Sequence, residues 1–101
     1  MDWERLAEDL RSHVERLART PRTPETPAHQ EAAQYIREQL QKAGFLVREE
    51  PFDEAGFEGT NLITQPIPDR SDLPLLIVGA HYDTKPATPG ADDNASGVAA
   101  L

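Results

Sequence analysis

Residues 73–83 read LPLLIVGAHYD, and this stretch decides the fold of the chain. Its apolar part is continuous instead of alternating, which is typical of a strand that is covered on both faces of a sheet. Pro74 is compatible with such a strand because it stands near the beginning, where no ladder hydrogen bond is lost. The stretch therefore predicts a buried strand over residues 73–80, with a histidine and an aspartate directly after its end.

Shorter elements are predicted on both sides of that strand. Apolar residues at spacings of three and four predict two amphipathic helices, the second capped by Thr26-Pro27 at its start and by Gly44 at its end. Alternating residues predict two half-exposed strands. The predicted elements are helices over residues 2–19, 26–44 and 95–101, and strands over 45–52 and 60–64. This order predicts an α/β fold with a mixed, largely parallel sheet and flanking helices.

The first chemical motif is His81 and Asp83 at the end of the predicted buried strand. Residues two apart in a strand point the same way, so a neutral imidazole can bind a metal ion while Asp83 holds its other ring nitrogen. The alternative is a histidine at a strand end that makes ordinary hydrogen bonds. This short pattern does not decide between the two by itself.

The second motif is PGADDNASG over residues 89–97. Asp92, Asp93 and Asn94 are compatible with a simple capped turn at a helix start. The same residues also fit the early positions of an EF-hand loop, but the preceding PATPG sequence breaks the helix that such a loop requires, and its final glutamate would lie past Leu101. Taken together, the two motifs indicate half of a two-metal hydrolase site.

Composition narrows the function further. The chain has 101 residues, at most one small domain, and 10 basic against 18 acidic side chains give a net charge of −8. This charge argues against nucleic acid or an anionic membrane as a partner. The absence of cysteine leaves histidine, aspartate and glutamate as metal ligands. With no apolar stretch of signal-peptide or transmembrane length, we expect a cytoplasmic protein.

GAHYDT followed by PGADDNASGVAAL resembles the co-catalytic zinc exopeptidases of metallopeptidase family 28. This family includes leucyl-type aminopeptidases and the related glutaminyl cyclases. Four upstream segments resemble the family's N-terminal region in the same order: Pro21-Arg22, residues 32–36, Gly44-Phe45 and residues 60–63. The resemblance thus covers nearly the whole chain.

The resemblance implies that His81 binds zinc, that Asp83 orients the imidazole as a catalytic residue, and that Asp93 bridges two zinc ions. It also implies a cis peptide bond after Asp93. The reaction would be hydrolysis of an N-terminal peptide bond in a peptide substrate. The family's general base and further ligands have no counterpart in residues 1–101, so we expect an incomplete catalytic domain, zinc exopeptidase-like and truncated after its first metal motifs, that is inactive alone.

Two other functions stay open. One is a glutaminyl-cyclase-like acyltransferase, which the same family resemblance allows. The other is a non-catalytic fragment that acts through protein contacts, because two ligands do not close two zinc sites. We also expect self-association, since a buried strand over residues 75–78 would lack neighbours on one edge in a chain of this length.

Overall fold

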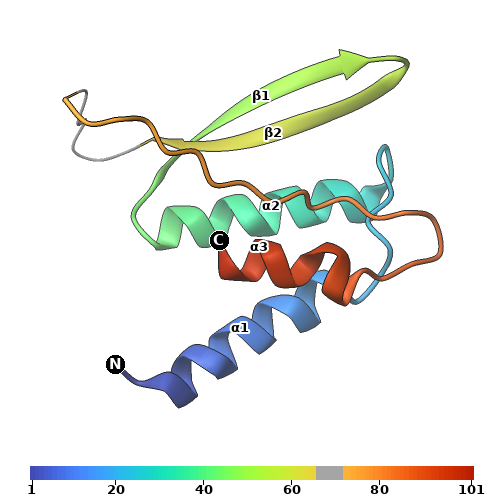
Figure 1. Cartoon of the computed structure of the whole chain (residues 1–101). Coiled ribbons are helices and arrows are strands. Elements are labelled where there is room, and N and C mark those ends of the chain that lie inside the picture. The colour runs from blue at the N-terminus through green and yellow to red at the C-terminus, as the bar shows by residue number, and fades with distance from the viewer. Residues whose placement is uncertain (66–71) are drawn as a thin grey trace.

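A computed structural model describes residues 1–65 and 72–101 (Figure 1). The elements in chain order are α1 (Trp3–Leu17), α2 (Pro27–Lys42), β1 (Leu46–Glu54), β2 (Phe57–Gln65), the π-helical turn η1 (Ala91–Ala95) and α3 (Ser96–Ala100). The β1–β2 sheet lies on one side of α2, and α3 and α1 lie on the other (Figure 1). None of the described helices combines the length and the apolar character needed to cross a membrane.

Both long helices confirm the sequence prediction, and α1 ends two residues earlier than expected. The Asp2 side chain caps α1 by accepting a hydrogen bond from the backbone N–H of Arg5. The Thr26 side chain caps α2 in the same way through the N–H of His29. Gly44 follows α2 with a φ of +98°, a left-handed conformation that ends a helix without a Cβ clash.

The small core joins the two ends of the chain. Leu17 of α1, Ala32 of α2 and Ala95 of η1 are buried, and Ala95 has no exposed surface. Partly buried residues packed around them are Val14, Tyr35, Ile36, Tyr82 and Val98. The segment that carries the second chemical motif is therefore held against both helices.

The strands predicted at residues 45–52 and 60–64 form a hairpin. β1 and β2 pair antiparallel from Leu46 opposite Gln65 to Glu54 opposite Phe57, so both strands are longer than expected. Ala55 and Gly56 make the two-residue turn, both with positive φ. The ion pair of Arg37 on α2 with Glu49 on β1 ties the hairpin to the helix.

The predicted buried strand over residues 73–80 does not form. In the part of the chain that the structure describes, the sheet has two antiparallel strands, and residues 74–80 belong to neither. Leu75, Leu76, Ile77 and Val78 are 68–83% exposed. A continuous apolar run predicts burial, but a strand also needs a neighbour to bond its backbone, and these residues have none in the sheet. The fold is thus a small α/β arrangement with an antiparallel hairpin.

The exposed run over residues 75–78 is expected to make the 101-residue chain associate. Contiguous apolar surface is removed from water when two such segments meet. Replacing Ile77, which is 80% exposed, by aspartate should shift the weight-average mass in sedimentation equilibrium toward the monomer. Trp3→Asp, at an apolar residue of α1 that is 70% exposed and lies outside the run, makes the same charge change and should leave association through the run intact. Equal masses for wild type and Ile77→Asp would contradict this role of the run.

Candidate metal site

Tyr82 fixes the loop that follows the exposed run. Its ring packs against the core, and its hydroxyl donates a hydrogen bond to the carbonyl of Thr60 on β2 at 2.7 Å. Neighbouring side chains of an extended chain point to opposite sides, so His81 and Asp83 face away from Tyr82. Their side chains are about half exposed, at 56% and 46%. The loop thus presents both groups at the surface.

The imidazole of His81 lies between two carboxylates. Its Nδ1 is 3.2 Å from Oδ1 of Asp83, and its Nε2 is 3.1 Å from Oδ1 of Asp93. The structure therefore brings together all three residues that the sequence singled out. Each ring nitrogen has a different acidic neighbour, so the two carboxylates are placed for different roles.

The turn before α3 gives Asp93 its position. Asp93 and Asn94 have non-helical backbone angles inside η1, and the peptide bond between them is cis, as the resemblance implied. The side-chain amide of Asn94 donates to the carbonyl of His81 at 3.3 Å. The Ser96 hydroxyl donates to the carbonyl of Asp92 at 2.8 Å. Asn94 therefore links the two motifs directly.

The donor atoms suit a zinc ion. Tetrahedral zinc takes nitrogen and carboxylate ligands at about 2.0–2.2 Å, which places two ligand atoms roughly 3.3–3.6 Å apart. The 3.1 Å between His81 Nε2 and Asp93 Oδ1 is close to that separation. Residues 1–65 and 72–101 contain no group of three or more His, Cys, Asp or Glu side chains placed to hold a metal ion. The described residues therefore bring together two candidate ligands, His81 and Asp93, where a zinc site usually has four.

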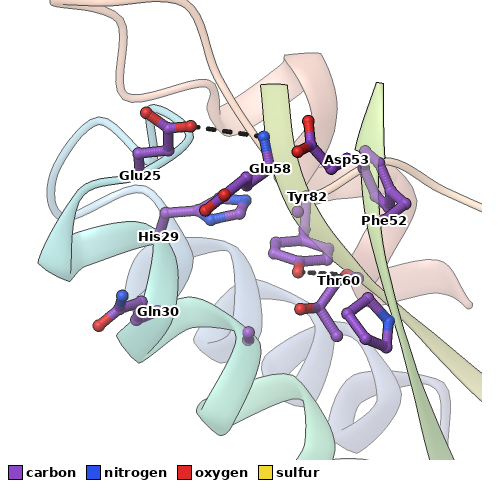
Figure 2. A pocket seen from close by; sticks show the side chains of 11 residues that line it. Glu25, His29, Gln30, Phe52, Asp53, Glu58, Thr60 and Tyr82 are labelled. Carbon is purple, nitrogen blue, oxygen red and sulfur yellow. Dashed lines mark hydrogen bonds between the residues drawn. The ribbon is translucent and has the colours of Figure 1, made fainter. Parts of the chain in front are cut away.

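A separate cavity of about 520 Å³ lies between α2 and the hairpin, on the Tyr82 side of the loop. Figure 2 shows the His29 ring beside Tyr82 in this cavity, and the two rings stack with centroids 4.8 Å apart. Burial lowers the pKa of His29, and the nearby charge of Asp83 opposes this shift. The cavity lining does not include His81, Asp83 or Asp93, so the candidate metal site and the cavity are distinct.

Arg22 is the structural residue that sequence reasoning missed. It is 1% exposed, and its side chain donates hydrogen bonds to backbone carbonyls in the loops on both sides of the site. In the sequence, Pro21-Arg22-Thr23-Pro24 indicates the end of a helix, and Pro21-Arg22 forms part of the family resemblance. No local pattern shows that an arginine between prolines is buried.

Comparison with known proteins places the two motifs in a family. The sequence model of peptidase family M28 matches residues 61–101, which contain His81, Asp83 and Asp93. This segment belongs to peptidase family M28. The M28 segment begins within β2 and includes the exposed run, both loops, η1 and α3, whereas Arg22 and the two long helices lie outside the matched residues.

The chain is also similar to bacterial and fungal proteins. The chain is 40% identical to the uncharacterized protein YfbL of Escherichia coli K12, over 69% of this chain and 24% of that protein. It is 31% identical to a vacuolar membrane protease of Candida glabrata and 40% identical to one of Clavispora lusitaniae, each over 45% of this chain. The chain spans about a quarter of the bacterial relative and 5% and 4% of the fungal ones.

Proposed function

We propose that this chain is the N-terminal part of a zinc-dependent exopeptidase domain, to which it contributes His81 and Asp93 as zinc ligands. The observation that carries the proposal is the imidazole of His81 with one carboxylate at each ring nitrogen. The match of residues 61–101 to a peptidase family supports it. Sequence outside these 101 residues would contribute the remaining ligands and the general base.

Asp83 and Asp93 have different tasks in this proposal. Asp83 accepts the Nδ1–H of His81 and so selects the tautomer whose Nε2 lone pair points toward Asp93. Asp93 is 82% exposed at its side chain, which leaves its second oxygen open to a second cation and gives a peptide access to the site. When bound, zinc supplies polarisation of the scissile carbonyl and lowers the pKa of a water molecule.

The test uses the full-length protein that contains this chain. It should release the first residue from peptides with a free amino terminus, lose this activity to a chelator and regain it with zinc. N-acetylated versions of the same peptides should resist, because an exopeptidase of this kind acts at the free terminus. The isolated 101-residue chain is the matched control, and we expect it to be inactive and to bind fewer than two equivalents of zinc in calorimetry.

Three results would overturn the proposal. Cleavage inside N-acetylated peptides would indicate an endopeptidase. Conversion of N-terminal glutamine to a cyclic product with release of ammonia, without peptide cleavage, would indicate an acyltransferase. Full activity of the isolated chain would show that residues 1–101 already contain a complete site.

A further inference from the structure

Arg22 lies between α1 and α2, and its side chain binds both loops of the candidate metal site, the one at Tyr82 and the one at Pro89-Gly90. Its Nε donates to the carbonyl of Tyr82 at 2.9 Å, and its Nη1 donates to the carbonyls of Leu17 and Pro89 at 2.5 and 2.6 Å. Its Nη2 donates to the carbonyl of Gly90 at 3.2 Å. One buried side chain therefore holds four backbone carbonyls from three segments of the chain.

The backbone of Arg22 makes the same connection. Its N–H donates to Oγ1 of Thr84 at 2.8 Å, and its carbonyl accepts the N–H of Thr84 at 3.1 Å. Thr84 is itself 7% exposed. The loop after Asp83 is thus fixed to Arg22 by two backbone contacts as well as by the guanidinium. Fixing both ends of that loop leaves it little freedom to move relative to α1.

The acceptors of Arg22 stand next to the proposed ligands. Tyr82 lies between His81 and Asp83 in sequence, and its carbonyl belongs to the peptide bond that leads into Asp83. The carbonyl of Gly90 also accepts the N–H of Ala95 at 3.0 Å, which closes the turn that contains Asp93. The guanidinium therefore fixes each motif within a few residues of its ligand and sets their separation.

The four carbonyls around this side chain require an arginine at position 22. Its four acceptors are all neutral carbonyls, which lie in different directions around the guanidinium plane, and a planar fork with five N–H donors reaches them together. A lysine ammonium has three donors on one atom and cannot span the same set. These carbonyl contacts explain how Arg22 can be buried. Burial lowers the pKa of Arg22, and the nearby charge of Asp83 opposes this shift.

We propose that Arg22 is a positioning residue, which fixes the distance between His81 and Asp93 and thereby sets the zinc affinity of the site. This inference rests on the proposed function, in which these two residues bind zinc. The hydrogen bonds of its side chain reach the two ligands through backbone carbonyls of the loops that carry them.

The experiment compares Arg22→Met and Arg22→Lys with wild type in the full-length protein. Methionine keeps an unbranched stem but has no donors, whereas lysine keeps the charge and part of the donor set. Arg19→Met is the matched control, since Arg19 is exposed in the same connection. Zinc affinity is measured by competition with a chromophoric chelator, the ligand geometry by the visible spectrum of the cobalt form, and the loops by amide exchange of the metal-free protein.

We expect Arg22→Met to bind zinc about 10–100-fold more weakly, the range for partners that orient ligands without binding the metal. Its cobalt spectrum should change, and amide protection at residues 81–95 should fall while that of α2 is kept. Arg22→Lys should recover part of the affinity, and Arg19→Met should match wild type.

The outcomes distinguish failure of the positioning role from failure of the proposed function. If wild type and Arg19→Met bind zinc tightly and both folded Arg22 variants do so equally well, the positioning role is wrong and the proposed function stands. If wild type binds no zinc, the proposed function and the positioning role both fall. If both Arg22 variants lose amide protection throughout α1 and α2, Arg22 supports the whole fold, and a specific positioning role is excluded.

Discussion

Replacing Asp93 by alanine in the full-length protein is expected to lower zinc affinity by more than about 100-fold, and to lower activity at limiting zinc accordingly. Asp93 Oδ1 stands 3.1 Å from the nitrogen of His81 that is proposed to bind the metal, so its removal takes away a ligand. Asp83→Ala removes only the group that orients the imidazole, and should cost about 10–100-fold. The ordering of the two effects is the prediction.

Asp92→Ala is the matched control for this comparison. Asp92 adjoins Asp93 and has the same charge, yet it accepts the Ser96 hydroxyl through its backbone carbonyl, which the substitution keeps. Metal content after dialysis against a buffered zinc solution, together with the rate of N-terminal residue release, measures all three variants. Near-normal zinc content in Asp93→Ala, or a larger loss in Asp83→Ala, would show that Asp93 is not a ligand.

Replacing Gly90 by alanine is expected to destabilise the fold by about 2 kcal/mol or more. Gly90 has a φ of +64°, a left-handed conformation in which a Cβ is strained. A Cβ built there would lie 2.5 Å from the carbonyl oxygen of Asp93 and 2.6 Å from Cγ2 of Thr84. The backbone of the turn must shift to make room, because the first of these atoms is itself backbone.

Urea unfolding followed by far-ultraviolet circular dichroism measures this cost. Gly79→Ala is the control, since an added Cβ at Gly79 meets nothing within 4 Å. It should change the free energy of unfolding by less than about 0.5 kcal/mol. If the two variants unfold at the same urea concentration, the turn at Gly90 is not as tightly packed as the distances indicate.

The sequence predicted those parts of the fold that depend on near neighbours. The caps at Thr26 and Gly44 and the two apolar stripes act within a few residues, and α1 and α2 appear where these signals place them. The hairpin is also local, because a two-residue turn joins its strands. The prediction of a buried strand at residues 73–80 was wrong, because burial and strand pairing depend on segments that are distant in sequence and that no local pattern identifies.

The sequence likewise indicates some residues of the candidate site and not others. His81 and Asp83 are two residues apart at a predicted strand end, so spacing pointed to this pair, whereas the resemblance to family 28 selected Asp93 from the acidic motif. Their meeting at one imidazole also matches the resemblance. Arg22 was missed because its role depends on carbonyls of Tyr82 and Gly90, and every residue type has a carbonyl, so no sequence pattern marks such an acceptor.

The contacts of Arg22 also constrain when this region can form. The guanidinium joins residues that are 60, 67 and 68 positions further along the chain, whereas the helices and the hairpin close over short distances. Closing such a long loop costs chain entropy before any contact compensates for it, so local elements form first. During synthesis Arg22 leaves the ribosome several seconds before Gly90, at about 5–20 residues per second. Until then its guanidinium stays hydrated, and within residues 1–101 we expect the two loops that hold the acidic motifs to assemble after the helices and the hairpin.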